Sequence, residues 1–176
     1  MSEHIVNLAD VVVQSPNDTP IPAGVPSGDA AARYDLRWGE IASRIGARKL
    51  GYNLTVVAPG KRACPFHSHR ADEEMFFILE GNGELRYGDK RSPIRAGDII
   101  ACPPGGPETA HQIINTGTVE LRYLAVSTMA AVEICEYPDS GKFGVFADGL
   151  PDTNDDSARF RHLARHEDAR DYWEGE

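Results

Sequence analysis

The chain has 176 residues, of which 41% are hydrophobic and 26% are charged, and these ordinary globular values exclude global disorder and a fibre. The formal net charge of −9 and the lack of a Lys/Arg cluster argue against nucleic acid and anionic membrane as partners. No apolar run is long enough to span a bilayer, the first residues lack the basic start of a secretory signal, and the three cysteines are widely spaced. We therefore expect a single cytoplasmic domain, spanning 1–176, with no membrane or nucleic-acid partner.

The N-terminal part, 1–49, is predicted to be an irregular arm. Its segment 14–35 is rich in Pro, Gly, Asp and Ser, a composition typical of neither a helix nor a strand. Ile21, Pro22 and Val25 on this arm could cover a neighbouring subunit or wrap the chain's own core.

Short β-type runs punctuated by Gly or Pro then follow about every ten residues, which predicts an all-β sandwich or barrel with its core at about 50–137. The run 74–80 is apolar on both faces, as expected of a central strand. Asn82-Gly83 predicts a tight hairpin turn after it. Strands are predicted at 51–60, 74–80, 84–88, 98–103, 110–115, 120–128 and 131–137.

The remaining residues, 138–176, are predicted to form a short tail with a weak surface helix over 157–173. His162 and His166 would share one face of that helix and could bind a metal. The arginines around them favour a solvated face instead.

The stretch HSHRADEE contains the first candidate metal ligands. Alternate strand residues share a face, so His67 and His69 point the same way and Ser68 points the opposite way, where an acidic substitution should be mild. Glu74 lies an odd number of residues beyond His69, and a turn or bulge at "RAD" would bring it to the same face.

The choice between Glu73 and Glu74 follows from the next strand. Glu74 alternates with Phe76 and Ile78, an apolar set expected to face the interior, so Glu74 is preferred over Glu73. His111 begins a later probable strand, which a barrel can place beside the first histidines. Imidazoles with one carboxylate suit zinc, iron, manganese, nickel or copper better than calcium.

Two segments of the chain resemble the two conserved motifs of the cupins. The first has one extra residue between its glycine and its first histidine, and the second is three residues longer between Gly105 and His111. The matching residues are Gly60, His67, His69, Glu74 and Gly81 in the first motif and Gly97, Pro103, Gly105, His111 and Asn115 in the second.

The resemblance implies a double-stranded β-helix, or jelly-roll barrel. His67, His69, Glu74 and His111 would hold one divalent transition metal ion: zinc, iron, manganese or nickel. A homodimer is also implied. The sequence is similar to uncharacterised single-domain bacterial cupins that carry a similar EYPDSGK stretch (136–142 here). Some of these cupins are labelled sugar-phosphate isomerases, only by analogy.

The function predicted from this resemblance is that of a small-molecule metalloenzyme acting on an oxygenated metabolite, either sugar isomerase-like or dioxygenase-like. The alternative is a non-catalytic, metal-centred protein that binds or senses a small molecule. A phosphosugar isomerase needs a basic clamp, for which Arg62, Arg70 and Lys142 are the candidates.

The sequence leaves the roles of three further residues open. Cys64 and Cys102 flank the ligand segments and could be sulfur ligands, redox thiols or buried packing residues. Tyr123 could face the cavity or belong to the core.

Overall fold

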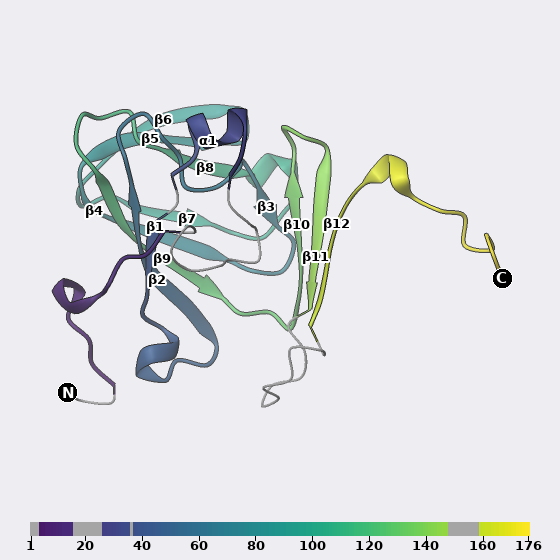
Figure 1. Ribbon diagram of the computed structural model, residues 1–176, viewed down its shortest axis with the longest axis horizontal. Coiled ribbons are helices and arrows are strands. Elements are labelled where there is room, and N and C mark those ends of the chain that lie inside the picture. The colour runs from purple at the N-terminus through teal and green to yellow at the C-terminus, as the bar shows by residue number, and fades with distance from the viewer. Residues whose placement is uncertain (1–3, 16–25, 36, 148–158) are drawn as a thin grey trace.

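The protein is an antiparallel β-barrel in the computed structural model, which describes residues 4–15, 26–35, 37–147 and 159–176 (Figure 1). Its strands form sheets of five, four and three strands, and strands distant in sequence pair within each sheet. This topology is the predicted all-β jelly roll. Among the described residues, no helix combines the length and hydropathy needed to cross a bilayer.

The five-stranded sheet supplies most of the core, and its central strand alternates as predicted. Phe76 and Ile78 are buried, whereas Phe77 between them is exposed. Leu121 and Tyr123 from the neighbouring strand complete this inner layer. The strands, in spatial order, are β1 (Arg37–Glu40), β2 (Leu50–Val57), β9 (Leu121–Thr128), β4 (Glu74–Glu80) and β7 (Ile99–Cys102).

The three-stranded sheet contains β6 (Lys90–Arg95), β5 (Asn82–Tyr87) and β8 (His111–Ile114), in that order. The predicted hairpin at Asn82-Gly83 is wrong, because both residues lie in β5, which pairs with β6 and β8 and not with β4. Gly81 makes the crossing between sheets instead. Its φ is +83°, and a Cβ there would lie 2.5 Å from the Glu120 carbonyl oxygen.

The four-stranded sheet closes one end of the barrel with β12 (Phe160–Arg165), β11 (Lys142–Ala147), β10 (Val132–Tyr137) and β3 (Ser68–His69) (Figure 1). The predicted C-terminal helix is wrong. Within 159–173, β12 pairs antiparallel with β11, and the 3-10 helix η5 (His166–Asp168) follows. The hydrogen bonds and side-chain packing offered by β11 outweigh the weak helical pattern, so His162 and His166 share no helix face.

The described part of the N-terminal arm packs against the barrel. It contains the 3-10 helices η1 (Leu8–Asp10) and η2 (Ser43–Ile45), the short helix α1 (Asp29–Arg33) and strand β1, which pairs with β2. The prediction of an irregular arm over 1–49 is therefore wrong for these elements, and that of no helix over 14–35 is wrong for α1. Val11 packs in a second core cluster with Ile41, Leu54 and Val56. Ile21, Pro22 and Val25 lie outside the described residues.

Candidate metal centre

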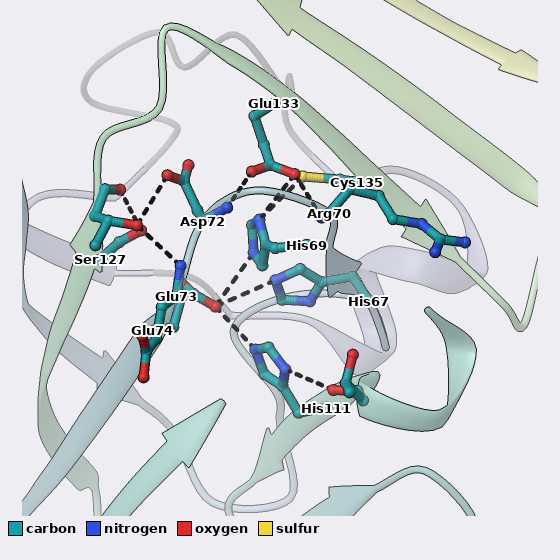
Figure 2. Close-up of polar contacts among 12 residues, drawn as sticks. His67, His69, Arg70, Asp72, Glu73, Glu74, His111, Ser127, Glu133 and Cys135 are labelled. Atoms are coloured by element: carbon teal, nitrogen blue, oxygen red, sulfur yellow. Dashed lines mark hydrogen bonds and ion pairs between the residues drawn. The ribbon is translucent and has the colours of Figure 1, made fainter. Parts of the chain in front are cut away.

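Four side chains from β3, β4, β8 and the bridge before β3 converge on one point (Figure 2). Oε2 of Glu74 lies 2.8 Å from Nε2 of His111, 3.2 Å from Nε2 of His69 and 3.8 Å from Nε2 of His67. The structure thus brings together all four residues that the sequence predicts as ligands. Glu73 is exposed and lies outside the cluster, so Glu74 is the carboxylate that faces the histidines.

The outer nitrogen of each histidine faces an acceptor. Nδ1 of His67 lies 2.8 Å from the Pro65 carbonyl oxygen, and Nδ1 of His111 lies 3.3 Å from that of Thr109. Nδ1 of His69 lies 3.4 Å from the Cys135 sulfur. A proton on each Nδ1 satisfies these contacts and leaves the three Nε2 lone pairs directed at the centre, which is how metal-binding histidines are usually oriented.

The inner atoms fit a cation. His69 Nε2 is buried and makes no hydrogen bond of acceptable geometry, although it lies close to Glu74. Three nitrogen lone pairs and a carboxylate oxygen would repel one another unless a proton or a metal ion lies among them. Three nitrogens and one oxygen are donors that zinc, iron, manganese and nickel accept. The residues present therefore fit the divalent transition metal that the sequence predicts.

The electrostatics of the cluster depend on the same charges. Burial lowers the pKa of His67 to about 4. Burial also opposes the charged form of His69, but its contacts with Cys135 and Glu74 dominate and raise the pKa of His69 to about 11. Burial alone would raise the pKa of Glu74, yet His111 and His69 hold it well below its usual range. The cluster thus favours a positive charge beside an ionised Glu74, and a metal ion supplies one.

A buried carboxylate on β10 holds the turn that brings Glu74 to the histidine face. Glu133 accepts backbone N–H groups from Arg70 at 2.8 Å, Ala71 at 3.1 Å and Asp72 at 2.5 Å. These residues form the non-strand segment between β3 and β4, which confirms the predicted turn at "RAD". One oxygen of Glu133 also lies 3.9 Å from Nδ1 of His69. In Figure 2, dashed lines join Glu133 to this turn and to His69.

Glu133 and Cys135 were not predicted from the sequence as residues of the site. An available signal was their alternation with Tyr137, which places an acid and a thiol on one face of the run 131–137. Ser68 corrects another expectation. It alternates with the histidines, but it is only 1% exposed and its hydroxyl has no partner, so an acidic substitution there cannot be mild.

A cavity of about 740 Å³ opens beside the cluster. His67, Glu74 and His111 line one part of it, and Lys142 and Phe146 from β11 line another. The remaining lining side chains mix apolar and polar groups: Trp38, Asn53, Thr55, Ala63, Cys64, Pro65, Phe76, Gln112, Ile113, Tyr123, Ala125, Tyr137, Arg161 and Leu163.

The two cysteines flanking the ligand segments differ in position. Cys102 is buried in the core opposite Glu74 in the β4–β7 pairing, and its burial raises the pKa of the thiol to about 12. Cys64 is exposed toward the cavity. Neither belongs to the group of donors around Glu74 among the described residues. Tyr123 satisfies both interpretations, because it is buried in the core and also lines the cavity.

The residues of the second motif make hydrogen bonds that fix the position of His111 and of β8. The longer gap before His111 holds the 3-10 helix η3 (Pro107–Thr109), whose last carbonyl accepts from the His111 ring. Asn115 is fully buried and donates to the carbonyls of Val57 and Val119. These bonds tie the end of β8 to β2 and to the start of β9.

The fold and this cluster define a jelly-roll barrel with a potential metal centre. Comparison with known families gives the same class, since the cupin domain family matches residues 53–127. Within these residues the chain is similar to a cupin domain.

Individual proteins are also similar to parts of the chain. The chain is 38% identical over 70 residues to the oxalate-binding protein of Thermotoga maritima, covering 40% of this chain and 54% of that protein. The chain spans about half the length of the curated relatives it matches.

Two solved structures are similar over longer ranges. One is provisionally labelled a sugar phosphate isomerase, from Acidithiobacillus ferrooxidans, with 26% identity, a TM-score of 0.66 and coverage of 77% of this chain and 80% of that one. Another, from Silicibacter pomeroyi, is labelled a sugar phosphate isomerase from a cupin superfamily. It has 19% identity and a TM-score of 0.74 over 97% of this chain and 98% of that one, which shows the shared fold.

Proposed function

We propose that this protein is a metal-dependent enzyme acting on a small oxygenated metabolite, with sugar isomerase-like chemistry as the first candidate. The observation that carries the proposal is the convergence of His67, His69, Glu74 and His111 beside a cavity of small-molecule size. These residues would hold one divalent ion: zinc, iron, manganese or nickel. Bound there, such an ion supplies a Lewis acid that polarises a hydroxyl or carbonyl oxygen.

The chain's own residues supply what else an isomerase needs. Thr55 donates to Asn53 on the cavity wall, so this wall presents oriented polar groups to a hydroxylated ligand. Tyr137 lies beside the cluster, with its ring stacked at 6.3 Å from that of His67, and its hydroxyl can hold a proton near the ligand. Phe76 and Ile113 exclude water from the inner wall.

The similar structure from Acidithiobacillus ferrooxidans supports the isomerase reading through its label. A dioxygenase-like reaction would use the same ligands, with iron as the natural ion. The oxalate-binding protein of Thermotoga maritima supports the second candidate function, a non-catalytic protein that binds a small acid at a metal. We also expect a homodimer, as the cupin resemblance implies.

The deciding experiment uses the full chain loaded separately with zinc, iron, manganese and nickel. Each form would be screened for aldose–ketose interconversion by proton exchange with solvent and for oxygen consumption with small hydroxy acids and diols. We expect isomerisation with at least one metal and none in the His111→Ala variant. Oxygen uptake would favour the dioxygenase version. Ligand binding without turnover in any form would leave the binding protein as the function.

A further inference from the structure

Lys142 on β11 lines the same cavity as the metal cluster but belongs to a different wall. We propose that Lys142 binds an anionic group of the ligand, either a carboxylate or a phosphate monoester, while the other oxygens of the ligand face the cluster. This proposal rests on the proposed function. The substrate class would then be small hydroxylated acids or phosphate esters rather than neutral sugars.

Strand register directs Lys142 into the cavity. Lys142 and Phe146 lie an even number of residues apart on β11, so their side chains share a face, and both line the cavity. The antiparallel partner of Lys142 is Tyr137 on β10, which lines the cavity as well. Three side chains of this sheet therefore face the same space.

Tyr137 connects Lys142 with the cluster. Its ring centroid lies 6.3 Å from that of His67 and 5.8 Å from Nζ of Lys142. The flexible Lys142 side chain can move toward a molecule of a few carbon atoms that lies along the tyrosine ring, with its oxygen atoms at the cluster and an acidic group at the other end. The ammonium is a compact charge suited to either acid.

The charges around Lys142 favour an external anion. Within the described part of the chain, no carboxylate lies within ion-pair distance of its ammonium. This is notable in a chain whose formal net charge is −9. A lysine that merely solubilises the surface would also lack a partner, but it would have no reason to share a cavity wall with Tyr137 and Phe146.

The other two residues predicted for the clamp, Arg70 and Arg62, contact other side chains and do not line the cavity. Nη2 of Arg70 donates to both oxygens of Glu136, at 2.8 and 2.9 Å. The Arg62 guanidinium lies 5.9 Å from the ring centre of Tyr34, and Arg62 does not line the cavity. Of the three, the structure leaves Lys142 as the cation facing the cavity. Arg161 on β12 lines it too.

The test uses three hydroxamates that share a metal-chelating end and differ in their tails. Glycolohydroxamate has a neutral tail, succinohydroxamate a carboxylate and phosphoglycolohydroxamate a phosphate. Calorimetric titration of the full-length, metal-loaded protein would compare wild type, Lys142→Met and Lys142→Gln. Lys90→Met is the control, because this substitution removes the same charge at a residue that is exposed on β6 and does not line the cavity.

We expect wild type and Lys90→Met to bind one or both acid-tailed hydroxamates about tenfold more tightly than the neutral one. Both Lys142 variants should lose this preference and keep their affinity for glycolohydroxamate within about twofold. The better of the two acidic tails distinguishes phosphate from carboxylate. No preference in wild type, or a preference that survives in the Lys142 variants, would overturn the assignment. Failure of every hydroxamate to bind would instead refute the metal-centred function on which the assignment rests.

Discussion

Two walls of one cavity are built differently in this protein. On the wall formed by β3, β4 and β8, each histidine is held at its outer nitrogen and Glu74 is positioned by a turn bound to a buried carboxylate. On the β11 wall, Lys142 is exposed, and the Tyr137 ring lies 5.8 Å from its ammonium. The first wall is preorganised before any ligand arrives, and the second can adapt.

The difference separates two tasks. A metal centre needs donors fixed to a few tenths of an ångström, which requires buried partners on every ligand. Recognition of one end of a ligand tolerates a long, mobile side chain whose charge acts over several ångströms. Substitutions behind the first wall should therefore damage stability and metal binding, whereas changes on the second should alter only ligand preference.

The largest expected effect is a loss of stability, from substitutions in the core next to the metal ligands. Ile78 is 0% exposed, and Ile78→Asp would place a carboxylate among apolar side chains, at a cost of several kcal/mol in the free energy of unfolding. Phe77→Asp is the matched control on the same strand, since Phe77 is 36% exposed and faces outward. Ser68→Asp should resemble Ile78→Asp, because Ser68 is enclosed. Thermal and urea melts measure all three, and equal melts for the Ile78 and Phe77 variants would contradict the strand facing.

The next effect is on metal content. His69→Ala and His111→Ala each remove a nitrogen donor and should weaken metal affinity by more than about 100-fold, because even the loss of an outer partner costs 10- to 100-fold. His162→Ala is the control, as His162 lies on β12 outside the cluster. Elemental analysis after dialysis against zinc, manganese, iron or nickel gives the occupancy. Chelation should also lower the melting temperature of wild type and the control but not of the two ligand variants. Full occupancy in the double ligand variant would refute the site.

Local patterns explain why the ligand wall could be predicted. Period-two alternation identified Glu74 with Phe76 and Ile78, and the spacing of His67 and His69 identified their common face. The partner of each outer nitrogen could not be predicted in the same way. Cys135 meets His69 only through the β3–β10 pairing, which joins segments 66 residues apart.

The errors in the fold have the same origin. Asn82-Gly83 is a strong hairpin signal, but Gly81 carries the chain to a different sheet before a hairpin can form. Segment 160–165 has a weak helical pattern, and only the open edge of β11 makes it a strand. In both cases a partner far away in the sequence decides the conformation.

A smaller effect is expected from Glu133, the buried carboxylate that holds the turn 70–72. Glu133→Gln keeps the size of the side chain but replaces one acceptor oxygen with an amide that cannot accept these N–H groups. Because hydrogen bonds to a charged group contribute about 1.5–3 kcal/mol, we expect a loss of about 2 kcal/mol in stability. Metal affinity should fall about 10- to 100-fold as His69 and Glu74 lose their alignment.

The control for this change is Glu84→Gln, which removes an equal charge from an ion pair with Arg91 at the surface. Calorimetric metal titration and urea unfolding of both variants give the comparison. If Glu84→Gln were equally damaging, net charge rather than the buried turn would account for the loss.

The smallest effect should come from the side chain of Arg70, whose backbone N–H belongs to the same turn. The guanidinium is directed to Glu136 at the exposed side of the turn, while the backbone N–H reaches Glu133 inside. Arg70→Gln removes the surface pair and leaves the buried bond intact. Exposed ion pairs contribute little to stability, so the melting temperature should fall by about 2 °C or less and metal affinity should stay within about twofold of wild type. Parallel metal titrations of Arg70→Gln and Glu133→Gln compare the side-chain contact of Arg70 with the contact of its backbone N–H. Equal losses of metal affinity would mean that the exposed pair, and not the buried carboxylate, holds the ligand wall in place.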